Sequence, residues 1–474
     1  MQRFTRIARA RWFRAISPLL LGVLVGLPAL PATAQMSPGL LALRPIKGVS
    51  YQPSPSDDCQ LQTQITPSPC TATPGYNSVY YDTDFYNTDF PLLWGPGTTA
   101  VPGRNDLKKL KDQGINFLHI YNWNAQRDHG TFLDAVAAHG MKLTVPVSNY
   151  TACLIVGGGC QGVSAGSYQT AYTNIQAIFN QVYNGGTTPH AAAGVWAIFN
   201  EYDYNSIDPV NVAFVIQAIL QLEANAGITG ANRLPFVVPV SNAVNAGSSS
   251  AWFQTAQALY QAIPNANSAI PAGVLAIIAV SVSLQNAHVS GTTTYGTVTV
   301  GAVPADLWSK RVIAAVNPFT SGPTINAYFM SANQFQSAFP GTAVTVTTPS
   351  AQTWKETWNT LPPLFFTEMG INIGGSGGTP QTQATWIQSQ LQCTNPWAVD
   401  ATSTTNGYFL GSNIFEFEYE GVNGRWGMFV FPSPPTFTTG TTTGTQSYRV
   451  DTLNAQPAWA SVLTGYQATT KTCP

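Results

Sequence analysis

Charged residues are scarce in this chain: Asp, Glu, Lys and Arg make up only 9% of its 474 residues. Its 20 basic and 21 acidic residues leave no basic excess of the kind that proteins use to bind nucleic-acid phosphates. Long apolar runs are missing too, because no stretch beyond the N-terminal region reaches the roughly 20 apolar residues of a membrane-spanning helix. We therefore expect neither a nucleic-acid partner nor a membrane span.

The N-terminal region has the three parts of a secretory signal peptide. Five arginines and no acidic residue lie in the first 14 residues, residues 16–30 are almost entirely apolar, and Ala32-Thr33-Ala34 offers small residues for cleavage. We expect residues 1–34 to be removed, which places the mature protein in the periplasm or outside the cell. Loss of the five arginines leaves 15 basic and 21 acidic residues, a net charge of −6.

The polarity of the mature chain comes from uncharged side chains. Thr, Ser, Asn, Gln and Gly are frequent, and they accompany 12 Trp, 19 Tyr and 23 Phe. This composition is typical of an extracellular protein that handles a neutral polymer.

Metal-ligand spacing is absent from the sequence. The five histidines are scattered and the six cysteines contain no CxxC pair, so we expect no metal and no other cofactor. An even cysteine count in an exported protein indicates disulfides instead, although six cysteines allow 15 pairings. Proximity favours Cys59–Cys70 and Cys153–Cys160, and Cys393–Cys473 would then hold the C-terminus.

Eight short apolar segments, with helical patterns between most of them, recur along the mature chain. Two of these helices end at Gly114 and Gly140, where a left-handed C-terminal cap fits. Alternating strands and helices predict a parallel sheet, and eight repeats predict that it closes. We therefore predict an α/β fold, a (β/α)8 TIM barrel, built by residues 35–474 as one catalytic domain. The expected strands are 47–51, 117–121, 142–146, 195–199, 236–240, 312–316, 364–367 and 413–417, and the expected helices are 106–113, 132–139, 172–183, 212–226, 251–263 and 381–391.

Three segments interrupt the alternation and are predicted to be insertions, near residues 53–103, 264–307 and 431–446. The second contains a Gly/Thr/Val-rich run that fits a hairpin, and the third is predicted to be an irregular loop. Loops that follow strands line the active-site face of such a barrel. We expect the first and third insertions to build the wall of a cleft.

Two of the expected strands end in a carboxylate. The segments Ala197-Ile198-Phe199-Asn200-Glu201-Tyr202 and Phe365-Phe366-Thr367-Glu368-Met369-Gly370 are apolar runs that lead directly to Glu201 and Glu368. A buried carboxylate needs a partner or a cleft, and a structural ion pair is the alternative for either residue alone. On strands four and seven of one barrel, however, the two glutamates converge over its mouth and form the acid and nucleophile pair of a retaining glycosidase. Their environments should separate the two pKa values.

Further residues at strand ends are candidates for sugar binding. Asn200 is placed to contact the 2-hydroxyl of the attacked ring or to cap the strand end. Tyr51, Tyr121 and Asn122 either line the subsite of that ring or pack in the core. Tryptophans such as Trp123 and Trp252 either pack in the core or stack on sugar rings. The substrate-binding residues that we predict are Asn200, Tyr51, Tyr121, Asn122, Asn317, Glu416 and Trp426.

Four segments in chain order resemble a known family. They are Lys47-Gly48-Val49-Ser50-Tyr51-Gln52-Pro53; Gly114-Ile115-Asn116 through Tyr121 with Asp128-His129 and Ala138-His139-Gly140-Met141; Phe365 to Gly370; and Ile414-Phe415-Glu416-Phe417 with Glu420 and Asn423 to Met428. In this order they resemble the β-1,3-glucanosyltransferases of glycoside hydrolase family 72. The resemblance implies a (β/α)8 retaining enzyme with Glu201 as acid/base and Glu368 as nucleophile.

The chain departs from the family pattern at three positions near the proposed chemistry. Phe199 precedes the Asn-Glu pair where the family has Gly, and His119 occupies the place of a strand-two Arg. Phe319 follows strand six where the family has a Tyr whose hydroxyl reaches the nucleophile. The resemblance is therefore that of a distant relative of the family.

These observations predict a secreted retaining glycoside hydrolase or transglycosylase that acts on β-glucan, with a β-1,3 linkage as the leading assignment. A β-1,4-glucan or mannan hydrolase with the same chemistry is one alternative. A carbohydrate-binding pseudoenzyme is the other, and the loss of the strand-two Arg and the strand-six Tyr is its main support.

Overall fold

The computed structural model describes residues 38–55, 84–157, 165–205, 207–241, 292–304, 307–331, 343–347, 353–357, 363–374, 378–400, 409–418, 425–432, 439–443 and 446–474. Several predictions fall outside these residues: the signal peptide, the Cys59–Cys70 disulfide, the helix at 251–263, and most of the first and second insertions. Cys153 is disulfide-bonded, but its expected partner Cys160 is also outside the description.

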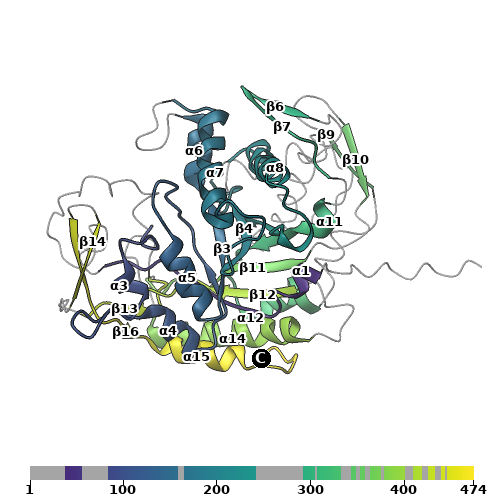
Figure 1. Cartoon of the computed structure of the whole chain (residues 1–474). Helices are drawn as coiled ribbons and strands as arrows, with labels where there is room; N and C mark the ends of the chain where they lie inside the picture. The colour runs from purple at the N-terminus through teal and green to yellow at the C-terminus, as the bar shows by residue number, and fades with distance from the viewer. Residues whose placement is uncertain are drawn as a thin grey trace, which may run out of the picture. The chain divides into compact units, whose positions relative to one another are not determined.

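Eight parallel strands close into a barrel in the order β1-β12-β11-β8-β5-β4-β3-β2, and helices surround it (Figure 1). The (β/α)8 prediction is therefore confirmed. The barrel strands are β1 (Ile46–Ser50), β2 (Phe117–His119), β3 (Lys142–Val147), β4 (Ala193–Ile198), β5 (Phe236–Val240), β8 (Val312–Val316), β11 (Leu364–Met369) and β12 (Phe409–Ile414). The helices are α1 (Pro38–Leu41), α3 (Pro91–Trp94), α4 (Asp106–Asp112), α5 (Gly130–Ala138), α6 (Asn149–Val156), α7 (Tyr168–Tyr183), α8 (Pro209–Asn225), α11 (Leu307–Arg311), α12 (Gly322–Ile325), α14 (Pro380–Val399) and α15 (Pro457–Tyr466), with a 3₁₀ turn η1 (Gly230–Asn232) and a π-helical turn η2 (Asn326–Ser331).

All eight predicted strands belong to the barrel, and β12 is the one whose bounds were most in error. It begins before the predicted segment 413–417 and ends inside it, at Ile414, because Gly411 and Ser412 belong to the strand but show no apolar pattern. Gly411 has a φ of 139°, and a Cβ there would lie 2.0 Å from the Ile46 carbonyl oxygen, so only glycine fits against β1. The glycines predicted to cap α4 and α5 are confirmed: φ is 80° at Gly114 and 66° at Gly140.

Side-chain space inside the barrel is limited where β1 passes β12. Gly48 pairs with Asn413, and a Cβ on Gly48 would lie 1.5 Å from Asn413 Oδ1. The Asn413 side chain is fully buried, and its Nδ2 donates to the Thr367 carbonyl oxygen at 3.3 Å. The amide therefore cannot move toward solvent to make room.

We expect Gly48→Ala to lower the free energy of unfolding by about 1–3 kcal/mol or more, the usual cost of overpacking a dense core. The midpoint of chemical denaturation measures this loss. As the matched control, Gly39→Ala adds the same methyl group where nothing lies within 4 Å of the new Cβ, and it should not lower the midpoint. Equal stability of the two variants would contradict the tight contact.

The C-terminal helix α15 lies next to α14, as Figure 1 shows, and it contacts β1 and β12 through Tyr466. The Tyr466 hydroxyl donates to the Gly48 and Ser412 carbonyl oxygens at 2.7 and 2.8 Å and accepts from Gly48 N. Asn395 Nδ2, from α14, donates to the Tyr466 carbonyl oxygen at 3.0 Å. The predicted Cys393–Cys473 disulfide is confirmed and links α14 to the residues after α15.

This disulfide spans 80 residues of sequence, so it removes much of the freedom of the unfolded C-terminal segment. The chain-entropy model gives a stabilisation of about 4–5 kcal/mol for a loop of this length. We expect Cys393→Ser with Cys473→Ser to lower the melting temperature clearly, and reductant to lower that of the wild type by more than that of the variant, which keeps the disulfide of Cys153. A wild type that is insensitive to reductant, and equal in stability to the variant, would contradict this role.

Hairpins extend from the barrel. β6 (Thr293–Tyr295) pairs with β7 (Val298–Val300), as the sequence predicted for the second insertion. The third insertion was wrongly predicted to be irregular throughout, because β14 (Thr439–Thr443) pairs with β15 (Gln446–Val450). β9 (Ala343–Thr347) with β10 (Thr353–Thr357), and the short pair β13 (Phe429–Val430) with β16 (Asn454–Ala455), were not predicted. Within the described residues, no helix is both long and apolar enough to cross a bilayer.

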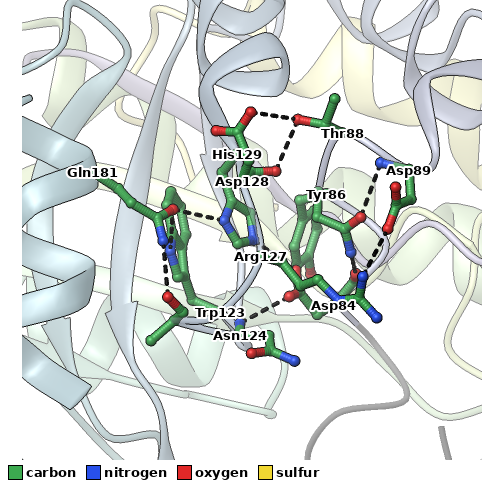
Figure 2. A network of polar contacts seen from close by, with 12 residues as sticks. Asp84, Tyr86, Thr88, Asp89, Trp123, Asn124, Arg127, Asp128, His129 and Gln181 are labelled. Atoms are coloured by element: carbon green, nitrogen blue, oxygen red, sulfur yellow. Dashed lines mark hydrogen bonds and ion pairs between the residues drawn. The ribbon is translucent and has the colours of Figure 1, made fainter. Parts of the chain in front are cut away.

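A polar network fastens the described end of the first insertion to the loop that follows β2 (Figure 2). The fully buried His129 ring places Nε2 2.9 Å from Asp84 Oδ1 and Nδ1 2.8 Å from Gln181 Oε1, and it stacks on Trp123 with ring centroids 4.0 Å apart. Trp123 Nε1 donates to the same Gln181 oxygen at 3.1 Å. Trp123 is therefore a packing residue, and the network joins the loop to α7.

Candidate active site

Glu201 lies three residues beyond the end of β4, on a backbone with two unusual conformations. φ is 57° at Phe199 and 46° at Glu201, in the left-handed region that costs a non-glycine residue about 1–2 kcal/mol. This explains why glycine suits the position before the Asn-Glu pair. In this chain Phe199 is 2% exposed, so burial of its ring offsets the backbone strain.

Hydrogen bonds from neighbouring loops hold this strained turn. Asn149, which follows β3, accepts from Asn200 N at 2.8 Å and donates to the Asn200 carbonyl oxygen at 3.0 Å. Asn205 Nδ2 donates to the carbonyl oxygens of Asn200 and Glu201, each at 3.0 Å. Strain that is held by several contacts in this way is typical of functional sites.

The Glu201 carboxylate is contacted by Asn317, the residue that follows β8. Asn317 Nδ2 donates to Glu201 Oε1 at 3.0 Å and to Asn200 Oδ1 at 3.5 Å. Burial raises the pKa of Glu201 to about 7, since it outweighs the Asn317 hydrogen bond, which lowers the pKa; the nearby charge of Asp203 raises it further. Near neutral pH the group therefore exchanges a proton readily.

The Asn317 amide also reaches the strand that carries the second glutamate. Thr367 Oγ1 donates to Asn317 Oδ1 at 2.6 Å, and Thr367 immediately precedes Glu368 on β11. One amide thus contacts Glu201 on one side and the neighbour of Glu368 on the other. The two glutamates, 167 positions apart in sequence, are in this way linked at the same end of the barrel.

Glu368 is 4% exposed and receives a hydrogen bond from the Tyr121 hydroxyl. Ser50 Oγ lies 2.8 Å from the same hydroxyl, so Ser50 donates to Tyr121 while Tyr121 donates to Glu368. Burial, and next the charge of Glu368, raise the pKa of Tyr121, which keeps the hydroxyl protonated. The charge of Glu416, which is 1% exposed, acts on Tyr121 in the same direction.

His119 lies beside Glu368, with Nε2 3.9 Å from Glu368 Oε1. Burial lowers the pKa of His119 to about 3, so the ring is neutral at pH 7. The position at which the sequence resemblance implied an arginine thus holds an uncharged imidazole. The Tyr121 hydroxyl supplies the hydrogen bond that Phe319 cannot give.

Three aromatic side chains form a cluster next to these groups, which we call the aromatic cluster: Phe319, Phe415 and Trp426. The Trp426 ring centroid lies 4.8 Å from that of Phe319 and 5.5 Å from that of Phe415. The Phe415 ring in turn lies 6.2 Å from Tyr121. Trp426 and Phe319 are partly exposed, so the cluster presents an apolar face on the side of Tyr121.

The structure separates the predicted site residues into two groups. It brings together Glu201, Asn200, Asn317, Glu368, Tyr121, Glu416 and Trp426, and it leaves Asn122 half-buried beside Tyr121. Tyr51 is not among them: its side chain is fully buried, and its hydroxyl donates to Asp106 Oδ2 at 3.2 Å. β1 ends at Ser50, and successive side chains of a strand face opposite sides, so Ser50 contacts Tyr121 while Tyr51 joins the core.

Several residues with a role in this site were missed from the sequence. Ser50, Asn149 and Thr367 are small polar residues at strand ends, where packing and capping give the same pattern. Asp203 could have been identified from the sequence, because it is a second carboxylate two residues after Glu201. It is 6% exposed and accepts from Ser241 N at 2.8 Å and from Ser241 Oγ at 2.5 Å.

The arrangement can move protons and stabilise charge on an oxygen, since it combines a carboxyl of raised pKa with a second buried carboxylate. In the described parts of the chain, no three His, Cys, Asp or Glu side chains lie close enough together to hold a metal ion.

No protein-family model matches the chain, and neither does any curated protein sequence. Among solved structures, Saccharomyces cerevisiae Gas2p in complex with laminaripentaose is 12% identical over 89% of this chain and 65% of its own, with a TM-score of 0.43. Gas2p in complex with laminaritriose and laminaritetraose is 12% identical over 77% of this chain and 58% of its own, with a TM-score of 0.40. The chain is thus distantly similar to yeast Gas2p, and it spans less than two thirds of the length of that protein.

Proposed function

We propose that this protein is a secreted, retaining glycosidase or transglycosylase that acts on β-glucan, with Glu201 as acid/base and Glu368 as nucleophile. The observation that carries the proposal is the position of the Asn317 side chain. Its amide donates to Glu201 and accepts from Thr367, the residue immediately before Glu368. Two carboxyl groups at one barrel mouth, with different hydrogen-bond partners, are what double displacement requires.

The different surroundings of the two carboxyl groups assign their roles. Glu201 has a pKa of about 7, so it carries a proton in a useful fraction of molecules near neutral pH. Glu368 accepts a hydrogen bond from the Tyr121 hydroxyl, a partner that a carboxylate nucleophile can use. The acid is therefore assigned to Glu201, in the loop after β4, and the nucleophile to Glu368, on β11.

The reaction follows from these roles in two steps. A Glu368 oxygen bonds to the anomeric carbon while the bond to the glycosidic oxygen breaks, and Glu201 gives its proton to that oxygen. The Asn317 amide donates to Glu201 and stabilises the carboxylate that this step creates. In the second step Glu201 takes a proton from water or from a sugar hydroxyl, whose oxygen bonds to the anomeric carbon and releases Glu368.

Asn200 is oriented to contact the sugar that is attacked. Its Oδ1 faces Asn317 Nδ2 at 3.5 Å, and Asn149 and Asn205 hold its backbone. This leaves the Asn200 amide nitrogen to donate to the 2-hydroxyl, a contact that strengthens in the transition state. Glu416 would accept from a further hydroxyl of the same ring, and the aromatic cluster would pack against the apolar face of a ring.

The choice of β-1,3-linked glucan rests on the sequence resemblance to glycoside hydrolase family 72. The same two-step chemistry serves β-1,4-glucan or mannan, so linkage is the part of the proposal that experiment must decide. Export rests on the predicted signal peptide.

Product analysis by mass spectrometry tests the proposal. The mature protein is incubated with reduced laminari-oligosaccharides, and in parallel with reduced cello- and manno-oligosaccharides, with Glu368→Gln as the matched control. Products longer than the substrate would establish transfer, and only shorter products would establish hydrolysis. Turnover of the β-1,4 series alone would replace the linkage assignment. Binding without turnover on any series would identify a carbohydrate-binding pseudoenzyme and overturn the proposal.

A further inference from the structure

Tyr204 is unusually exposed for an aromatic residue of this chain. It leaves 64% of its surface accessible, whereas Tyr202, two residues earlier, is fully buried. Among the large apolar side chains that stand out as exposed in the described residues, Tyr204 is the one aromatic; the others are Leu41, Val101, Val156, Val210 and Leu463. An aromatic ring kept in water forgoes the stabilisation that its burial would bring.

The backbone that carries Tyr204 is held firmly. Asn205 N donates to the Glu201 carbonyl oxygen at 2.8 Å, and Asn205 Nδ2 donates to the same oxygen at 3.0 Å. The Asp203 carboxylate accepts from the backbone N–H of Tyr204 and from Ser241. The exposure of the Tyr204 ring is therefore a property of a fixed turn that directs Tyr202 inward and Tyr204 outward.

The turn also places Tyr204 close in sequence to Glu201, the proposed acid/base. It follows Glu201 by three residues in the loop after β4, at the carboxyl ends of the barrel strands. The acid/base contacts the glycosidic oxygen, which joins the attacked ring to the ring that leaves, whereas the nucleophile contacts only the attacked ring. A ring on the loop of the acid/base is therefore the one expected on the leaving-group side.

We propose that Tyr204 is the stacking platform of an acceptor-side subsite, which binds the β-linked sugar ring that leaves and, later, the ring that receives the glycosyl group. This inference rests on the proposed function. An occupied subsite places a sugar hydroxyl, rather than water, next to Glu201 when the glycosyl-enzyme breaks down. Tyr204 would therefore favour transfer over hydrolysis.

β-Laminaribiosyl fluoride as donor and laminaribiose as acceptor test this inference. The leaving group is a single fluoride, so the donor leaves the acceptor side empty. Transfer product and hydrolysis product come from one glycosyl-enzyme, so their ratio does not depend on how fast a variant forms that intermediate. Tyr204→Ala should lower the ratio about 2- to 12-fold at subsaturating laminaribiose, the range expected for one aromatic stacking contact. Tyr204→Phe should keep the wild-type ratio, because the aromatic ring that would stack on the sugar remains.

Leu463→Ala, which truncates another exposed side chain on α15, is the matched control and should keep the wild-type ratio. An unchanged ratio in Tyr204→Ala would overturn the inference and leave the proposed function standing. A wild type that releases fluoride but never transfers would do the same. A wild type that consumes neither this donor nor β-cellobiosyl fluoride would remove the proposed function and this inference with it.

Discussion

Replacing Glu368 with glutamine is expected to lower turnover of oligosaccharides by at least about 10³-fold, the scale seen when a nucleophile is removed. The amide keeps the size of the side chain and the hydrogen bond from Tyr121, but its oxygen does not form the glycosyl-enzyme. Initial rates measured by product analysis give the loss. Because the variant removes a charge that is 4% exposed, its melting temperature should equal or exceed that of the wild type.

A retained melting temperature together with retained turnover would contradict the role of Glu368 as nucleophile. The control for position is Glu223→Gln, which removes a buried carboxylate that is paired with Arg311 at 2.8 Å, away from the proposed site. We expect this variant to lose stability, since it breaks a buried ion pair, and to keep its turnover per folded molecule.

Activity is expected to fall as the pH rises through about 7, because the first step needs the proton of Glu201, whose pKa is about 7. On the basic side, kcat/KM should drop tenfold per pH unit. Glu201→Gln should remove this dependence and lower kcat on oligosaccharides by about 10²- to 10⁴-fold. Formation of the glycosyl-enzyme from a glycosyl fluoride should be spared, because fluoride leaves without a proton. A flat profile from pH 6 to 9 in the wild type would contradict the assignment.

The same pKa predicts a change in stability that does not depend on activity. The pKa of Glu201 is raised from 4.5 to about 7 in the folded protein, so the folded state loses stability as the pH rises between these values. Glu201→Gln should therefore be more stable than the wild type at pH 8 and show no such advantage at pH 4. Thermal melts at the two pH values measure this difference.

Asp203→Asn removes the charge that raises the pKa of Glu201 further, so it should move the basic limb of the activity profile to lower pH.

The barrel and the two glutamates could be predicted from the sequence because each depends on local pattern. A strand that is buried on both faces appears as a short apolar run, and eight such runs with helices between them define the closed sheet. Glu201 and Glu368 interrupt these runs at their ends, so their place at the mouth follows from the order of the strands. The error in the predicted bounds of β12 has the opposite cause. Gly411, Ser412 and Asn413 belong to the strand but carry no apolar pattern, so the pattern did not show where the strand begins.

The closed barrel and the strand that leads to each glutamate were thus predictable from local pattern alone, and Cys393–Cys473 was the pair that remained once proximity had favoured the other two. The assembly of the site could be seen only in the folded chain. Asn317 meets Glu201 and Thr367 across loops, Tyr121 instead of Phe319 supplies a hydroxyl to Glu368, and burial makes His119 neutral. A pKa and a hydrogen-bond partner depend on burial and on side-chain direction. A one-residue difference in where a strand ends reverses that direction, which is why Ser50 belongs to the site and Tyr51 to the core.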